Sequence, residues 1–215
     1  MKSLADCRLY TFVDAAYLDG RDPADVARQL CDGGSDVIQL RAKGAGPGQI
    51  RTMAERILPI AQRAKVRFVI NDHPEIARDL GVYAHLGQED FFEAGYADVS
   101  QLPVARVGLS THAPDQARRA IAAGPSYIAI GPVYATGTKP GAQPVTLEYV
   151  RWAAREVSIP WFAIGGIDLG NLDDVLAAGA QRICVVPAIL KTKGISEACQ
   201  AFRQRLPSAP LQKDI

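Results

Sequence analysis

The sequence predicts a single-domain (β/α)8 TIM barrel, in which eight parallel strands form a closed ring inside a ring of helices. Short runs of β-forming residues alternate with segments of helical period along the chain. Roughly eight strand–helix units of about 25 residues each account for a chain of 215 residues. An open, doubly wound sheet is the alternative, because a sequence does not show closure. No GxGxxG motif follows the first strand, which counts against the dinucleotide-binding form of that alternative.

The expected strands are short runs rich in apolar and β-branched residues. They span Leu9 to Val13, Asp36 to Leu40, Arg67 to Ile70, Tyr83 to Leu86, Arg106 to Leu109, Tyr127 to Ile130, Trp161 to Ile164 and Arg182 to Val186.

The segments between these strands carry helix start and stop signals. In DPADVARQLCDGG, residues 22–34, Asp22 can cap the helix, Pro23 suits its first position and the two final glycines suit its end. APDQARRAIAAG and NLDDVLAAGA follow the same pattern. No Pro/Ser-rich linker divides the chain, so we expect one domain over residues 1–215, with 207–215 as a loose C-terminal tail.

The composition and charge exclude some classes of partner. Hydrophobic residues make up 48% of the chain, and 24 basic and 23 acidic residues leave a net charge of +1. Without a basic stripe, neither nucleic acid nor a membrane surface is expected as a partner. The four cysteines form no CxxC pair, and we find neither a signal peptide nor a membrane span. We therefore expect a cytoplasmic protein, and the sequence leaves a homo-oligomer possible.

Polar side chains follow the strands, where all strand ends of a barrel face one mouth. In chain order the polar ones are Gln39, Arg41, Lys43, Asn71, Asp72, His85, Gln88, Glu89, Asp90, Ser110, Thr111, His112, Thr136, Thr138 and Lys139. The seventh and eighth strands end instead at Gly165, Gly166, Val186 and Pro187. The loops before the strands contain mainly glycine and alanine. This asymmetry predicts that the mouth is the functional face.

The charges at this mouth suit a diphosphate and a metal ion. Arg41, Lys43 and Lys139 are three cations, and arginine and lysine together suit polyphosphate oxygens. Asp72 and Asp90 would repel a phosphate unless a divalent cation lay between them, and Mg²⁺ is commonly held by carboxylates plus substrate phosphates. The loops after the seventh and eighth strands are the usual phosphate site of this architecture. Two phosphorylated reactants are therefore expected.

Several of these residues also have a purely structural interpretation. Asn71 and Asp72 could form a turn and a helix cap, and Ser110 and Thr111 could cap the following helix. His85 and His112 are expected to be structural hydrogen-bond donors rather than metal ligands, since no Cys/His spacing resembles a zinc site.

Seven motifs, in order and spacing, give the chain a resemblance to the thiamine phosphate synthase family. They are IQLRAK, VIND, AHLGQED, VGLSTH, IAIGPVYATGTKPG, FAIGGI and ICVVPAI. The resemblance covers nearly the whole chain. It implies a barrel that joins hydroxymethylpyrimidine diphosphate to a thiazole phosphate and releases pyrophosphate with the help of Mg²⁺.

The resemblance also implies a role for each matched residue. Gln39, Arg41, Lys43 and Asn71 would hold the pyrimidine diphosphate, Asp72 and Asp90 would bind Mg²⁺, Ser110 and Lys139 would contact the diphosphate, and Thr136, Thr138, Gly166, Val186 and Pro187 would hold the thiazole phosphate. Arg41, Lys43, Ser110 and Lys139 would be the catalytic residues. No nucleophile or general base is needed, because an aminopyrimidine can delocalise the positive charge left when the diphosphate departs.

The chain departs from the family pattern at two positions. Ala42 stands where the family usually has glutamate, so a side chain that would support the site from behind is missing while Arg41 and Lys43 remain. Pro187 stands where the family usually has serine, and proline has no N–H to give to the thiazole phosphate.

Two other functions remain as alternatives. A thiazole tautomerase would share the barrel and the thiazole phosphate site but would need neither metal nor diphosphate, and His112 would be its candidate proton carrier. A non-catalytic barrel could bind thiamine precursors without converting them.

Overall fold

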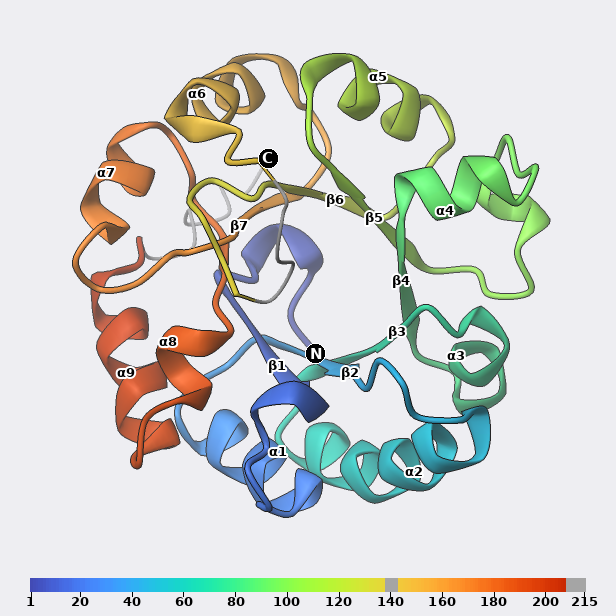
Figure 1. Ribbon diagram of the computed structural model, residues 1–215, viewed down its shortest axis with the longest axis vertical. Helices are drawn as coiled ribbons and strands as arrows, with labels where there is room; N and C mark the ends of the chain where they lie inside the picture. The colour runs from blue at the N-terminus through green and yellow to red at the C-terminus, as the bar shows by residue number, and fades with distance from the viewer. Residues whose placement is uncertain (138–142, 208–215) are drawn as a thin grey trace, which may run out of the picture.

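Eight parallel strands close into a barrel in chain order, which confirms the predicted (β/α)8 fold and excludes the open sheet. The computed structural model describes residues 1–137 and 143–207. The strands are β1 Leu9–Asp14, β2 Val37–Arg41, β3 Arg67–Asn71, β4 Tyr83–Gly87, β5 Val107–Thr111, β6 Tyr127–Ile130, β7 Trp161–Ile164 and β8 Ile183–Cys184. Figure 1 looks along the barrel and shows the strands inside a ring of helices.

The helices follow their strands around the ring. They are α1 Pro23–Asp32, α2 Pro47–Arg63, α3 Pro74–Leu80, α4 Gln88–Glu93, α5 Pro114–Ala122, α6 Thr146–Glu156, α7 Leu172–Ala177, α8 Pro187–Leu190 and α9 Ile195–Arg205, with 3-10 turns η1 Leu4–Asp6, η2 Ala15–Tyr17 and η3 Val99–Gln101. The predicted cap of α1 is present, because the Asp22 carboxylate accepts hydrogen bonds from the amides of Ala24 and Asp25.

Two predicted caps are absent from their helices. The N-cap of α3 is His73 and the N-cap of α5 is Ala113, and neither has a side-chain cap hydrogen bond. Thr111 instead shares its hydroxyl with the Ala129 carbonyl and the Tyr149 hydroxyl. The capping interpretation of Asn71–Asp72 and Ser110–Thr111 is therefore wrong, and the buried Thr111 hydroxyl is used inside the fold.

The eighth strand is shorter than predicted. It spans Ile183–Cys184 rather than Arg182 to Val186. The Val185 amide still donates to the Tyr10 carbonyl of β1 at 3.0 Å, but at Val186 the chain turns into α8, whose first residue is Pro187. Because α8 begins at Pro187, the residues just before it leave the strand conformation, and β8 ends early.

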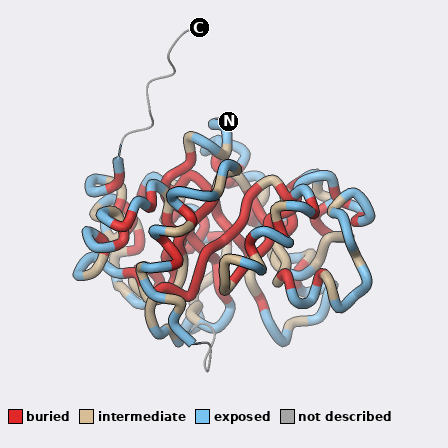
Figure 2. Tube along the Cα trace, turned by 90° about the horizontal axis from the view of Figure 1, so that it is seen from above, coloured by how far each residue is buried: buried red, intermediate tan, exposed pale blue. Residues whose placement is uncertain are grey.

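Large side chains fill the middle of the barrel. The rings of Tyr10, Tyr127 and Phe162 pack edge to face, with centroids 5.3 to 6.0 Å apart, and all three residues are buried. Figure 2 shows the buried chain concentrated in the strands, while the outer turns of the helices are exposed. The three rings form what we call the aromatic floor, above which the mouth opens.

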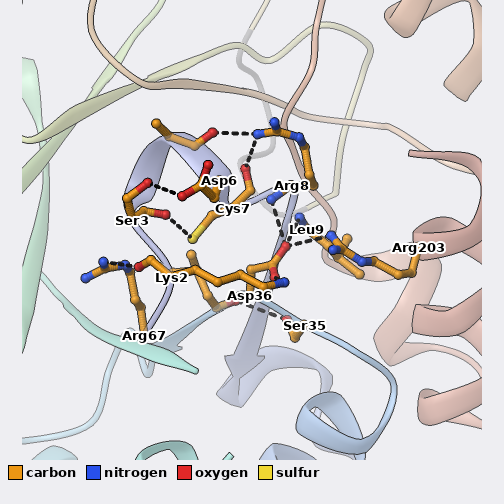
Figure 3. A network of polar contacts seen from close by, with 12 residues as sticks. Lys2, Ser3, Asp6, Cys7, Arg8, Leu9, Ser35, Asp36, Arg67 and Arg203 are labelled. Carbon is orange, nitrogen blue, oxygen red and sulfur yellow. Dashed lines mark hydrogen bonds and ion pairs between the residues drawn. The ribbon is translucent and has the colours of Figure 1, made fainter. Parts of the chain in front are cut away.

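The amino ends of the strands are tied together by Asp36 (Figure 3). Its buried carboxylate accepts hydrogen bonds from the Arg8 and Leu9 amides of the first strand and forms ion pairs with Lys2 and with Arg203 of α9. One side chain thus joins the N-terminal segment, the first two strands and the last helix.

Two further observations concern the chain as a whole. The four cysteines are free thiols. Within residues 1–137 and 143–207, no helix combines the length and the apolar character that crossing a bilayer requires. The predicted loose tail lies, apart from Pro207, outside the described residues.

Candidate active site

One cavity opens at the carboxyl ends of the strands, and it brings together the described residues to which the family resemblance gives a role, whereas Gln88 and Glu89 are not among its lining residues. Its wall includes Gln39, Arg41, Lys43, Asn71, Asp72, Asp90, Ser110, Thr136, Gly166, Val186 and Pro187. Thr138 and Lys139, which we expected on the thiazole phosphate and the diphosphate, lie outside the described residues. Side chains from strands far apart in the sequence thus share a single mouth.

Arg41 is held in place by a carboxylate that the sequence analysis missed. Its Nη1 donates to Asp14 Oδ2 at 2.8 Å, and the Arg41 and Asp14 side chains are 15% and 1% exposed. Asp14 pairs with Arg41 in the β1–β2 register and also accepts from the Ala16 amide. Arg41 thus has a carboxylate partner in Asp14, although Ala42 stands where the family usually has glutamate. Asp14 directly follows the predicted first strand, so reading that strand end like the others would have found it.

Asp72 is the most strongly constrained acid of the mouth. Its φ of 62° lies in the left-handed region, and its amide donates to the His85 carbonyl at 2.9 Å. The Asp72 carboxylate accepts a hydrogen bond from the side-chain Nδ2 of Asn71 at 2.6 Å and lies 3.8 Å from Lys43 Nζ. Desolvation raises the pKa of Asp72, with Lys43 acting against it and the Asp90 carboxylate adding to it. The ionised form of Asp72 is therefore disfavoured in the protein alone, and a bound cation would favour it.

Asp90 reaches the cavity because the chain before it lacks a side chain. Asp90 lies in the first turn of α4, after the N-cap Gly87. A Cβ at Gly87 would meet Asp90 Oδ2 at 2.7 Å. Glycine at this position therefore lets the Asp90 carboxylate fold back toward the end of β4, on the same side of the mouth as Asp72.

The opposite wall consists mainly of backbone. The loop after β6 binds the loop after β7 through two hydrogen bonds, from the Val133 amide to the Ile164 carbonyl and from the Tyr134 amide to the Gly165 carbonyl. A Cβ at Gly166 would come within 2.6 Å of the Ala135 carbonyl oxygen. Gly166, which we expected to hold the thiazole phosphate, thus has a packing reason to be glycine, because a side chain there would clash with the loop after β6.

The step from β8 to α8 completes that wall. Val186 is the N-cap of α8, and Pro187 is its first residue. The Ile189 amide already donates to the Val186 carbonyl at 3.2 Å. Of the two amides that follow Pro187 in the chain, that of Ala188 is therefore better placed than that of Ile189 to replace the missing donor.

Other wall residues were not predicted as part of the site, or were given a different role. Phe12, Ile164 and Ile167 supply apolar surface, and Cys184 lies among them. Burial raises the pKa of Cys184 well above its usual range, so its sulfur is a neutral thiol rather than a nucleophilic thiolate. His85 and His112 also line the cavity. The Nδ1 of His112 contacts the Gly131 carbonyl, and burial lowers the pKa of His85 to about 4.

Known proteins with related sequences share one description. The family model for thiamine monophosphate synthase matches residues 9–189. The chain belongs to the thiamine monophosphate synthase family. It is 48% identical over 184 residues to the thiamine-phosphate synthase of Thermus thermophilus, covering 85% of this chain and 88% of that protein. It is 39% identical over 215 residues to the enzyme of the same name from Acidothermus cellulolyticus, covering 96% and 98%.

A solved structure of the thiamine monophosphate synthase family has the same fold. The thiamine phosphate pyrophosphorylase from Pyrococcus furiosus superposes with a TM-score of 0.79 at 24% identity, covering 94% of this chain and 96% of that one. The resemblance found in the sequence motifs is thus confirmed by the family match and the named relatives, and the fold by the superposition.

Proposed function

We propose that the cavity joins hydroxymethylpyrimidine diphosphate to a thiazole phosphate, with Mg²⁺ held by Asp72 and Asp90, and releases pyrophosphate. A transferase that forms the C–N bond of thiamine phosphate is the activity named by the relatives at up to 48% identity. The observation that carries the proposal for this chain is the meeting of two acids, Asp72 and Asp90, with Arg41 and Lys43 at one mouth.

The donor set fits Mg²⁺ shared with a substrate. Among the described residues, no three His, Cys, Asp or Glu side chains cluster in a way that could hold a metal alone. Asp72 and Asp90 supply two carboxylates, and Mg²⁺ is commonly held by one or two carboxylates plus substrate phosphates. Partial desolvation of Asp72, whose side chain is still 37% exposed, and the nearby Asp90 carboxylate raise the pKa of Asp72, and a divalent cation between the two carboxylates would relieve their repulsion. Bound there, Mg²⁺ would neutralise charge on the diphosphate.

The protein side chains then have distinct tasks around the pyrimidine diphosphate. Arg41, fixed by Asp14, presents a planar fork of N–H donors, and exposed Lys43 adds a mobile positive charge. The uncharged Gln39, only 2% exposed, suits the uncharged heterocycle below the diphosphate. Ser110 and Lys139 are proposed to contact the diphosphate as well. The charged side chains at the rim thus face the charged diphosphate, and the uncharged Gln39 deeper in the cavity faces the uncharged ring.

The chemistry requires positioning and electrostatics rather than a nucleophilic side chain. The bond between the pyrimidine methylene carbon and the diphosphate oxygen breaks, and its electron pair leaves with the diphosphate. The amino-substituted ring delocalises the positive charge, and the thiazole nitrogen then attacks the methylene carbon to form the C–N bond. Stabilising the leaving group and holding the acceptor close are the two contributions expected of the site.

The wall formed by the loops after β6, β7 and β8 is proposed to hold the thiazole phosphate. Thr136, Gly166 and the Val186–Pro187 step lie there, and Thr138 is expected to join them. Ala188 is proposed to supply the amide that Pro187 lacks. A cytoplasmic location and a homo-oligomer also remain predictions of the sequence.

Pyrophosphate release from both phosphorylated substrates, with and without Mg²⁺, tests the proposal. Asp72→Ala should abolish release, whereas Asp25→Ala, which removes an exposed carboxylate of α1, should leave it unchanged. Full turnover in excess chelator would exclude the metal role. The tautomerase alternative predicts isomerisation of the thiazole phosphate without metal, dependent on His112, and the binding alternative predicts no turnover at all.

A further inference from the structure

A chain of side-chain hydrogen bonds crosses the barrel beneath the cavity. Gln39 Nε2 donates to Tyr10 Oη at 2.7 Å, Tyr10 Oη lies 2.9 Å from Tyr127 Oη, and Tyr127 Oη lies 3.0 Å from His85 Nδ1. The four residues come from β2, β1, β6 and β4. We call this chain the Gln39–His85 relay.

The barrel interior is built around this relay. Gln39, Tyr10 and Tyr127 are at most 2% exposed, so their polar atoms depend on one another for hydrogen bonds. Gly108 of β5 faces Tyr127 in the register, and a Cβ there would overlap the Tyr127 ring. The absence of a side chain at Gly108 is what lets Tyr127 reach across to Tyr10 and His85.

The relay has a direction, because each tyrosine hydroxyl carries one proton. The Gln39 amide nitrogen donates to Tyr10, which leaves the Tyr10 proton for Tyr127 and the Tyr127 proton for His85 Nδ1. His85 Nδ1 must then be the acceptor, and the imidazole proton sits on Nε2. The opposite order would start from a proton on Nδ1 and end with the Gln39 oxygen on Tyr10. The tautomer of His85 and the orientation of the Gln39 amide are therefore linked.

We propose that Tyr10, Tyr127 and His85 are positioning residues that hold the Gln39 amide oxygen toward the cavity, where it accepts a hydrogen bond from the exocyclic amine of the pyrimidine. This inference rests on the proposed function, since it assigns the pyrimidine to the Gln39 side of the cavity. With one N–H of its nitrogen held by Tyr10, the Gln39 side chain is fixed in one of its two amide orientations, and its oxygen is the acceptor it offers to a ligand. A 4-oxo pyrimidine has no exocyclic N–H to donate to that oxygen and is expected to bind more weakly.

The orientation also bears on the reaction. As the diphosphate leaves, positive charge spreads from the methylene carbon onto the exocyclic amine, whose N–H groups become stronger donors. An acceptor fixed beside that amine before the reaction stabilises the charge as it develops. A rotated amide would place an N–H against the amine instead. The relay is therefore expected to act on both selectivity and rate.

The first experiment compares binding and turnover of the aminopyrimidine diphosphate with those of its 4-oxo analogue. Tyr127→Phe and Tyr10→Phe each interrupt the relay while keeping the ring. We expect the ratio of the two dissociation constants, and the ratio of kcat/KM values, to fall about tenfold, the value of one net hydrogen bond. Tyr83→Phe is the matched control, because its hydroxyl accepts from Arg67 at the amino end of the barrel. Wild-type selectivity in both relay variants would overturn the proposal.

The second experiment reads the relay in the unaltered protein. Nitrogen-15 NMR of the imidazole rings should show His85 with its proton on Nε2, and Tyr127→Phe should change that signal while Tyr83→Phe does not. A proton on Nδ1 would overturn the proposed direction. Failure of the wild-type protein to release pyrophosphate would count against the proposed function, whereas the ratio of dissociation constants and the NMR signal would still decide the relay.

Discussion

Asp14 shows how a single residue outside the predicted site can control a predicted one. Its carboxylate is buried and holds Arg41 at 2.8 Å, so the guanidinium is aimed before any ligand arrives. A preformed arginine fork loses less entropy on binding a diphosphate than a mobile one. The orientation of the Arg41 guanidinium therefore depends on Asp14 as well as on Arg41 itself.

Asp14→Asn tests this pairing. The variant keeps an oxygen for the Ala16 amide but loses the charge opposite Arg41, and we expect the KM for the pyrimidine diphosphate to rise about tenfold, as a hydrogen bond to a charged group is weakened. Steady-state kinetics measure the effect. Asp25→Asn, which alters an exposed pair with Arg28, is the control and should change nothing. An unchanged KM in Asp14→Asn would show that Arg41 is oriented by other contacts.

Pro187 gives a second prediction at this scale. Pro187→Ser restores an N–H at the start of α8, and the KM for the thiazole phosphate should fall several-fold. Initial rates at varied thiazole phosphate concentration give this value. If the KM stays the same, another donor, with Ala188 the first candidate, already serves the phosphate.

At the scale of the elements, glycines decide how strands and loops approach one another. Gly108 of β5 makes room for the Tyr127 ring of β6, while Gly165 and Gly166 make room for the loop after β6. These are contacts between neighbouring elements rather than contacts with a ligand. A glycine in such a loop can therefore be needed for packing, whether or not it also contacts a phosphate.

Gly108→Ala should be costly for this reason. The added methyl overlaps the Tyr127 ring, and we expect the free energy of unfolding to fall by about 3 kcal/mol. Gly48→Ala is the matched control, because Gly48 lies in α2 with open space around it and should become more stable by up to about 1 kcal/mol. Urea unfolding measures both. A stable Gly108→Ala protein would mean that Tyr127 can move aside at little cost.

At the scale of the whole molecule, the closure of the barrel depends on its shortest strand. β8 contributes two residues, and its register with β1 joins Leu9 to Ile183 and Tyr10 to Cys184. Asp36 reinforces this region by binding the first residues of β1 and Arg203 of the last helix (Figure 3). Closure is therefore supported by a buried ionic contact as well as by the strand ladder.

Asp36→Ala should weaken that closure. Its removal leaves two buried amides and Arg203 without their acceptor, and the free energy of unfolding should fall by about 3 to 5 kcal/mol. Asp173→Ala, which removes the exposed partner of Arg205 on the same helix, should cost less than about 1 kcal/mol. Urea unfolding gives both values, and hydrogen exchange should rise first in β8 and α9. Equal losses in the two variants would contradict the special role of Asp36.

The sequence was sufficient to predict the barrel and the residues around its mouth, for one physical reason. Parallel strands place their carboxyl ends on one rim, so residues as distant in sequence as Gln39 and Pro187 can be assigned to one face without knowing the register. Alternation of strands and helices is a local pattern and is visible in the chain itself.

Contacts across the barrel could not be predicted in the same way. The link from Gln39 to Tyr10 depends on the register of β1 against β2, and the link from Tyr10 to Tyr127 joins β1 to β6, which are not neighbours in the chain. The partner of Arg41 depends on the β1–β2 register, and the length of β8 depends on where α8 must begin. Such features follow from closure and packing, which a local pattern does not encode.

The aromatic floor of Tyr10, Tyr127 and Phe162 closes the cavity at its inner end. Since the barrel is filled beneath the cavity, substrates and products are expected to enter and leave through the opening at the carboxyl ends of the strands. A ligand bound near that opening would then block access to the residues deeper in the cavity.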